Sequence, residues 1–207
     1  DCERNLCTWK NCQYYCKIRW RLFAQSNENR KRLHQNMQPF SLRSKKGGNG
    51  MPSIYLLCVD YLQQPEYFQK AIRCLPDSER IRLQSIQNLQ QQRRALGAKQ
   101  LLCFVLKQYG IYPAVIETGE HGKPFLPQYP EFHFNLSHSG AYVVCVCAAN
   151  AVGVDLEQCR KRLPKPSKRI FSQTELNFLN QASSDDYQNR FLTLWTMKES
   201  YVKMIGG

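Results

Sequence analysis

The sequence predicts an α+β fold. Short apolar runs rich in β-branched and aromatic residues alternate with longer stretches of helical periodicity. These segments do not form a regular parallel strand–helix–strand repeat, so a doubly wound sheet is disfavoured. The hydrophobic fraction, 43% of 207 residues, is sufficient for a folded core.

The strands are expected where short apolar runs are rich in β-branched or aromatic residues. Four segments have this character: 53–62, 111–117, 141–149 and 151–157. A tight turn at Asn150 would join the last two of them, and a proline-rich connection at 121–134 precedes the third.

Helices are expected between these strands. Residues 75–110 form one helical stretch, with Asp77 or Ser78 as its N-cap and Gly110 at the C′ position. The sequence "SQTE" at 172–175 is a capping box that begins a second helix.

Composition sets one region apart. Residues 1–51 form a basic, cysteine-rich extension without sustained periodicity, and we assign it no fold. A start of the natural protein at Met51 is a further expectation, since the chain opens on Asp1.

Most of the positive charge lies in the extension. Residues 1–51 hold 11 Lys+Arg and 3 Asp+Glu, which gives +8, whereas residues 52–207 hold 18 and 13, which gives +5 of the total +13. The mildly basic remainder suits a small anionic substrate or an acidic protein partner as well as a polynucleotide. A nucleic-acid-binding protein therefore remains an alternative that rests on the extension alone.

The ten cysteines fall into two groups. Four lie in the first sixteen residues, at a C-x4-C-x4-C-x3-C spacing that is looser than known structural zinc sites: Cys2, Cys7, Cys12 and Cys16. The others are dispersed, which favours buried thiols in a reducing compartment.

No apolar run reaches the roughly 18 residues of a membrane span. No N-terminal segment has the charged, apolar and small residues of a signal peptide in their usual order. We expect a cytoplasmic protein.

Two segments carry polar residues suited to binding. In "VGVDLE", Asp155 and Glu157 project from one face of an extended segment, and two carboxylates there suit Mg²⁺ or form a solvated strand edge. In "FHFNLSHSG", Ser137 and His138 lie in a polar cluster just before a strand. This cluster could bind phosphate, act as a Ser/His nucleophile pair, or be an ordinary polar turn.

The final segment, "LWTMKESYVKMIGG", reads as a helix that Asp185 or Asp186 begins. Trp195, Glu199 and Lys203 share one of its faces at i, i+4 and i+8. Glu199 and Lys203 are either an exposed i, i+4 ion pair or, because Trp195 suggests partial burial, groups that bind something.

Together, "GKPFL", "FHFNLSHSG", "VGVDLE" and "LWTMKESYVKMIGG" resemble, in order and separation, the motif set of 4′-phosphopantetheinyl transferases, and most of all the long surfactin-synthetase-activating type. The resemblance runs from about Ile54 to Gly207. It implies a pseudo-twofold fold of two subdomains. Residues 52–150 would form the N-terminal α+β subdomain, and residues 151–207 the first part of the C-terminal one. It also implies transfer of the 4′-phosphopantetheine arm of coenzyme A to a serine of an apo acyl- or peptidyl-carrier protein, with release of 3′,5′-ADP.

The resemblance also implies residue roles. The Mg²⁺ ligands would be Asp155, Glu157 and Glu199, and Glu199 would also serve as the base. The diphosphate contacts would be Ser137, His138 and Lys203, with His138 and Lys203 assisting catalysis. The nucleotide side of coenzyme A would be bound by Lys123, Arg93 and Arg94.

One departure from the family concerns length. Family members of this type continue past the "KxxG" motif, so we expect the second subdomain to be truncated here and the chain to be poorly stable or inactive. A related alternative is a relative that binds coenzyme A or the carrier without catalysis. Because the long type is a pseudo-dimer in one chain, a monomer is expected, without membrane or nucleic-acid partners.

Overall fold

The computed structural model describes residues 40–42, 52–120, 122–159, 163 and 165–206. The expectations for the cysteine cluster at 2–16 and for a start at Met51 lie outside the described residues. Within the described ranges the chain mixes helices and sheet, which confirms the predicted α+β class.

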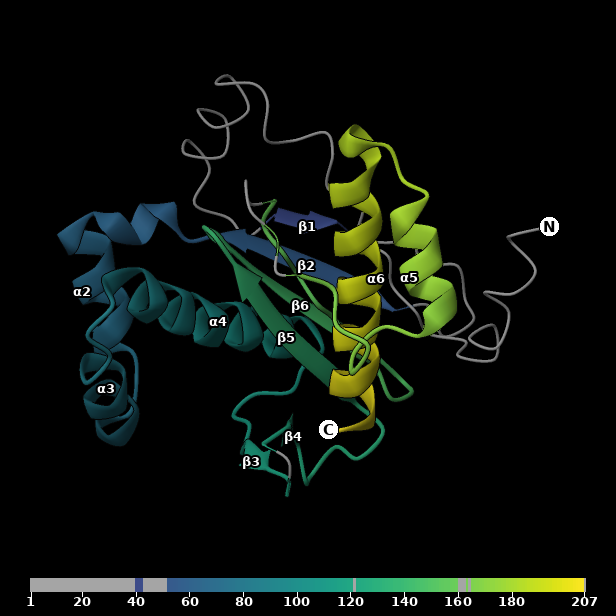
Figure 1. The fold of residues 1–207 in the computed structure, drawn as a ribbon. Coiled ribbons are helices and arrows are strands. Elements are labelled where there is room, and N and C mark those ends of the chain that lie inside the picture. Colours follow the sequence, from purple (N-terminus) through teal and green to yellow (C-terminus); the bar gives the residue numbers. More distant parts are fainter. Residues whose placement is uncertain (1–39, 43–51, 121, 160–162, 164, 207) are drawn as a thin grey trace.

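The central element is an antiparallel sheet with the strand order β1-β2-β6-β5 (Figure 1). Its strands are β1 (Phe40–Leu42), β2 (Ser53–Cys58), β5 (His133–Ser139) and β6 (Tyr142–Ala148). The predicted strand at 141–149 is therefore confirmed as β6. The predicted strand at 53–62 is too long, because the chain turns into a 3-10 helix at Asp60–Gln63.

A predicted strand at 111–117 is wrong. This segment is a loop up to a two-residue strand, β3 (Glu117–Thr118), which pairs with β4 (Pro124–Phe125). Val115 and Ile116 are exposed in it. Pro113 has no N–H to donate to a sheet ladder, which disfavours a buried strand in this apolar run.

The stretch predicted as one helix over 75–110 forms two helices, α3 (Asp77–Gln84) and α4 (Leu89–Gln108). The break occurs because Asn88 is an N-cap, and its side chain accepts a hydrogen bond from Gln91 N at 2.9 Å. The N-cap of α3 is Pro76 rather than Asp77 or Ser78, without a side-chain cap bond. The helix α2 (Pro65–Arg73) precedes them.

Two predicted helix ends are confirmed, at the C-terminus of the helix that ends at Gln108 and at the N-terminus of the helix that begins at Gln173. Gly110 follows α4 with a φ of +71°, as the C′ position requires. The capping box that begins α5 (Gln173–Asn180) is present: Glu175 N donates to Ser172 Oγ, and Ser172 N donates to Glu175 Oε2.

The last helix, α6 (Ser184–Ile205), begins after Ser183, so the prediction of Asp185 or Asp186 as its start is wrong. It is the longest described helix, with 22 residues. Among the described residues, no helix combines the length and the apolar character needed to cross a bilayer.

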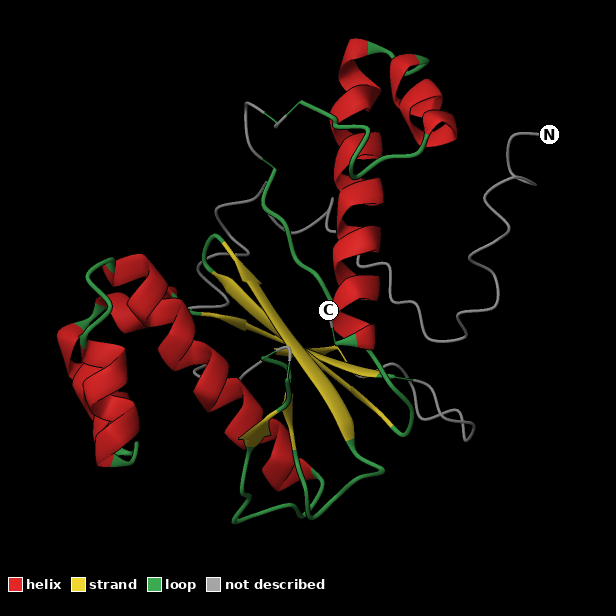
Figure 2. Cartoon of the chain, turned by 60° about the horizontal axis from the view of Figure 1, so that its bottom comes forward, coloured by secondary structure: helices red, strands yellow, loops and turns green. Residues whose placement is uncertain are grey.

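The sheet lies between helices (Figure 2). On one face, α4 packs on β2, β5 and β6 around a core that includes Leu101, Val105 and Val143. On the other face, Val144 and Val146 of β6 contact Val152 and Val154 of the segment that follows the sheet. A third apolar cluster joins α5 to α6: Phe171, Leu179, Phe191 and Leu194.

Candidate functional site

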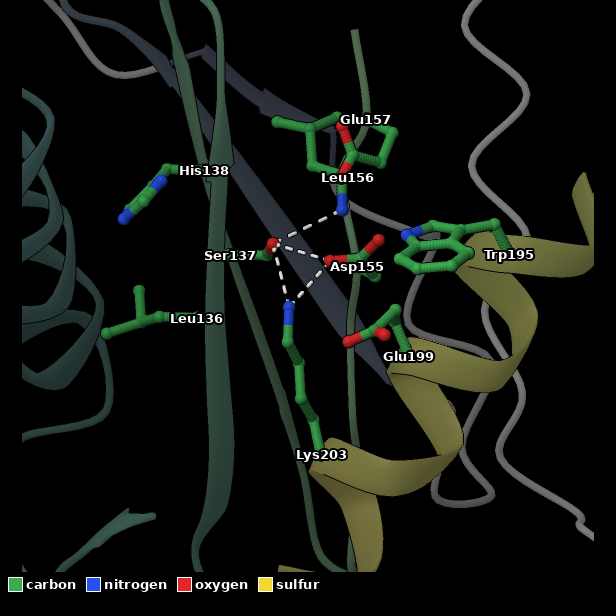
Figure 3. A pocket seen from close by; sticks show the side chains of 9 residues that line it. All are labelled: Leu136, Ser137, His138, Asp155, Leu156, Glu157, Trp195, Glu199 and Lys203. Atoms are coloured by element: carbon green, nitrogen blue, oxygen red, sulfur yellow. Dashed lines mark hydrogen bonds and ion pairs between the residues drawn. The ribbon is translucent and has the colours of Figure 1, made fainter. Parts of the chain in front are cut away.

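The motif "FHFNLSHSG" forms β5 itself, not a polar turn before a strand as the sequence suggested. Because side chains alternate along a strand, Asn135, Ser137 and Ser139 share one face, and each is at most 7% exposed. Leu136 and His138 point to the opposite side (Figure 3). The strand β5 therefore brings polar groups to an edge of the sheet from both of its faces.

The segment 151–157 was predicted as a strand and is not one; only Gly153 makes an isolated bridge. The reason is that its N–H groups bind side chains of β5 instead of a strand backbone. Val154 N donates to Asn135 Oδ1 at 2.9 Å and Leu156 N donates to Ser137 Oγ at 3.2 Å. The segment is thus extended without belonging to the sheet ladder.

The helix α6 approaches this segment closely at Gly153. A side-chain Cβ at Gly153 would overlap the Ser200 carbonyl oxygen and would lie 2.6 Å from Met204 N. Only glycine leaves room for this contact between backbones. Trp195, Glu199 and Lys203 then project from α6 toward the carboxylate of Asp155 (Figure 3).

These elements enclose a cavity of about 510 Å³. Its lining comes from β5, the extended segment and α6: Leu136, Ser137, His138, Asp155, Leu156, Glu157, Trp195, Glu199 and Lys203. All six residues predicted as metal ligands, diphosphate contacts or catalytic groups lie in this set. Sequence reasoning missed Leu136 and Leu156, which the alternation along their segments could have indicated.

An ion pair lies at the centre of the cavity. Lys203 Nζ donates to Asp155 Oδ1 at 2.6 Å and to Ser137 Oγ at 3.2 Å, and Ser137 Oγ donates to Asp155 Oδ1 at 3.0 Å. The Asp155 side chain is 6% exposed and that of Lys203 is 30% exposed. The second oxygen, Asp155 Oδ2, is buried and has no hydrogen-bond partner among the described residues.

Two family models match consecutive parts of the chain. Residues 62–150 match the model described as "4'-phosphopantetheinyl transferase, N-terminal", and residues 151–207 match the one described as "4'-phosphopantetheinyl transferase superfamily". The chain belongs to the 4′-phosphopantetheinyl transferase superfamily. The predicted resemblance is confirmed.

Individual relatives agree. A 4′-phosphopantetheinyl transferase of Bacillus subtilis is 38% identical over 116 residues, 55% of this chain and 52% of that protein. The 4′-phosphopantetheinyl transferase Sfp of Bacillus subtilis strain 168 is 36% identical over the same coverage. The transferase HetI of a Nostoc species is 31% identical over 155 residues, 70% of this chain and 65% of that protein. The chain spans about half the length of the first two relatives.

A metal ion is implied by the resemblance, and the residues present suit one. The three carboxylates that line the cavity supply only oxygen ligands, which Mg²⁺ prefers. Asp155 Oδ2, which is buried and has no hydrogen-bond partner among the described residues, has the chemistry of a metal ligand. The described part of the chain nevertheless holds no preformed cluster of three acidic, histidine or cysteine side chains.

The electrostatic surroundings of His138 favour its neutral form. Burial lowers the pKa of His138, and the nearby charges of Arg94 and Lys203 lower it further. A backbone hydrogen bond of His138 and, to a smaller extent, the charge of Asp155 act in the opposite direction, and the net pKa is lowered. Arg94 of α4 therefore lies within electrostatic reach of the cavity. Its Nε atom is buried without a hydrogen-bond partner in the described residues.

Three predicted cofactor contacts lie outside the cavity lining: Lys123, Arg93 and Arg94. Lys123 Nζ donates to the Met204 carbonyl oxygen at 2.6 Å, at the C-terminal end of α6, and burial lowers the pKa of Lys123. There it stabilises the carbonyl end of the helix dipole. Arg93, half-buried on α4, is also not among the lining residues.

Proposed function

We propose that this chain transfers the 4′-phosphopantetheine arm of coenzyme A to a serine of an apo carrier protein and releases 3′,5′-ADP. The observation that supports the proposal most is the convergence of Asp155, Glu199, Lys203 and Ser137 on one cavity. The relatives, which are named 4′-phosphopantetheinyl transferases, support the same reaction class.

The reaction forms one bond and breaks one. The carrier serine Oγ bonds to the β-phosphorus of coenzyme A, while the bond from that phosphorus to the bridging oxygen breaks. The electron pair stays on 3′,5′-ADP, and the serine proton passes to a base. Glu199, whose side chain lines the cavity, accepts this proton directly or through a water.

Charge neutralisation is the main requirement of such a step. Asp155, Glu157 and Glu199 would hold Mg²⁺, which supplies positive charge to the diphosphate oxygens. Lys203 would donate to the same oxygens, and its position beside Asp155 supports this role. Neutral His138 adds a hydrogen-bond donor without a charge that would repel Lys203.

The remaining parts of the proposal concern binding. Lys123, Arg93 and Arg94 bind the nucleotide end of coenzyme A, and the carrier protein is the macromolecular partner. Residues 52–150 and 151–207 act as two subdomains of a pseudo-twofold fold. The protein acts in the cytoplasm as a monomer, with no nucleic-acid partner.

The test is an assay of the full chain with coenzyme A, Mg²⁺ and an apo acyl-carrier protein, read by the mass of the carrier. Loading by the parent, together with a loss of about 100-fold or more in Asp155→Ala, would support the proposal. Glu120→Ala, which removes an exposed carboxylate outside the cavity, controls for lost charge. Circular dichroism checks that each variant is folded.

Two outcomes would contradict the proposal. Near-parent loading by folded Asp155→Ala would remove the metal assignment. No loading by the folded parent, together with calorimetric binding of coenzyme A, would instead indicate a relative that binds the cofactor without catalysis.

A further inference from the structure

We propose that Asn135 and Ser139 are positioning residues that fix the register of the extended segment, so that Asp155 and Glu157 both face the cavity. For its catalytic consequence this inference rests on the proposed function. Neither residue lines the cavity, and both are 6% exposed, so neither is expected to touch substrate.

The contacts form a repeated unit along β5. Ser137 Oγ accepts from Leu156 N and donates to the Asp155 carboxylate. Two residues further, Ser139 Oγ accepts from Gln158 N at 2.9 Å and donates to Glu157 Oε2 at 3.3 Å. Each serine therefore binds one acid and the N–H of the residue after it.

Asn135 begins this series. Its Oδ1 accepts from Val154 N at 2.9 Å, one residue before the first acid. The three side chains lie two residues apart on β5, and the three N–H groups lie two residues apart on the segment. The two chains therefore run in the same direction, joined by side chains in place of a backbone ladder.

This arrangement determines which way the acids point. Residues two apart in an extended segment share a face, so Val154 and Leu156 pack in the core while Asp155 and Glu157 face away from it. Loss of one acceptor leaves a buried N–H unpaired, which is costly. The segment then relaxes locally, and the acid beside the lost acceptor is no longer held in place.

The first experiment measures amide hydrogen exchange and does not depend on activity. In Ser139→Ala, Gln158 N–H should exchange at least about tenfold faster while Val154 N–H stays protected. In Asn135→Ala the pattern should reverse. Ser139→Thr and Asn135→Asp keep an acceptor oxygen and should restore protection.

Ser200→Ala is the matched control. Ser200 is 5% exposed, and within the described part of the chain its hydroxyl binds only carbonyl groups of α6, at Thr196 and Met197. The same hydroxyl is thus removed from the same neighbourhood without removing a contact to the segment. We expect it to leave the exchange of the segment amides unchanged.

The second experiment measures the Mg²⁺ concentration for half-maximal carrier loading. Ser139→Ala should raise this concentration roughly tenfold, because a metal ligand that loses its hydrogen-bond partner is held less well. The KM for the carrier should stay unchanged. Ser139→Thr should restore the parent's Mg²⁺ dependence. Suppose that Ser139→Ala speeds the exchange of Gln158 N–H but leaves the Mg²⁺ concentration for half-maximal loading unchanged. That result would overturn the positioning role. Equal exchange changes in Ser200→Ala would overturn the register contacts. A folded parent without transfer would refute the proposed function alone, since the exchange pattern still tests the contacts.

Discussion

Lys203 Nζ lies 2.6 Å from Asp155 Oδ1, and the Asp155 side chain is only 6% exposed. The ammonium group therefore neutralises a buried carboxylate. A cation that binds Asp155 meets the positive charge of Lys203, so the two compete for the same carboxylate.

The first prediction concerns Lys203→Met. We expect carrier loading to fall at least about 30-fold, because a diphosphate contact is lost, while Mg²⁺ binds about tenfold more tightly in the absence of coenzyme A. Isothermal titration calorimetry with Mg²⁺ measures the affinity. Lys168→Met removes an exposed charge elsewhere and should leave both quantities unchanged. Weaker Mg²⁺ binding by Lys203→Met would show that Lys203 does not compete for the site.

The second prediction concerns Gly153→Ala. A methyl group there overlaps the Ser200 carbonyl, so α6 must move away from the extended segment. We expect the free energy of unfolding to fall by about 2 kcal/mol or more, with loss of carrier loading. Urea denaturation measures the first. In the control Gly119→Ala, the added methyl group would lie 3.6 Å from Lys123 O, so stability should change by no more than about 0.5 kcal/mol.

The third prediction concerns the link between α5 and α6. Lys198 Nζ lies 2.9 Å from Glu175 Oε1, with side chains 24% and 14% exposed. A double-mutant cycle with Glu175→Gln and Lys198→Met should give a coupling energy of about 1 kcal/mol. Glutamine keeps the reach of the capping box, which isolates the charge.

The exposed pair Asp77–Arg80 provides the comparison for this cycle. Since solvent screens exposed charges, its coupling energy should be close to zero in the same urea titrations. Equal coupling energies for the two pairs would show that burial does not strengthen the Glu175–Lys198 contact.

The fourth prediction concerns pH. Burial lowers the pKa of His138, so between this lowered value and the ordinary one of about 6.5 the unfolded chain binds a proton that the folded chain does not. The contribution of His138 to stability is therefore complete above pH 6.5 and declines as the pH falls below it. Urea denaturation at pH 7.5, 6.5 and 5.5 should show a smaller decline in His138→Gln than in the parent. An identical decline would indicate that His138 is not responsible.

Short stretches of sequence predicted the elements that are stabilised by contacts between residues close together in the chain. The capping box at Ser172 and Glu175, the glycine after α4 and the apolar strand β6 were all identified from short windows. Helical spacing likewise anticipated that Trp195, Glu199 and Lys203 share a face, because i+4 neighbours are fixed by helix geometry alone.

The rest depends on contacts distant in sequence. The segment at 151–157 has strand composition, yet its N–H groups bind side chains 19 residues earlier, which no short window reveals. Lys123 matches a cofactor motif, but its ammonium group binds a carbonyl of α6, 81 residues away. For the motif that contains Asn135 and Ser139, a polar turn was one of the interpretations left open, because a buried polar face on a strand is unusual.

Pairing in the β5–β6 hairpin has a consequence for insertions and deletions. Ser137 lies opposite Val144, and Ser139 opposite Tyr142, across a turn of only Gly140 and Ala141. Neighbouring residues of a strand point to opposite faces. A shift of β5 by one residue would therefore put Phe134, Leu136 and His138 in place of the polar side chains of Asn135, Ser137 and Ser139. A single-residue indel on either side of this turn should therefore eliminate the site in one step, whereas a length change of two residues would preserve which side chains face the acids.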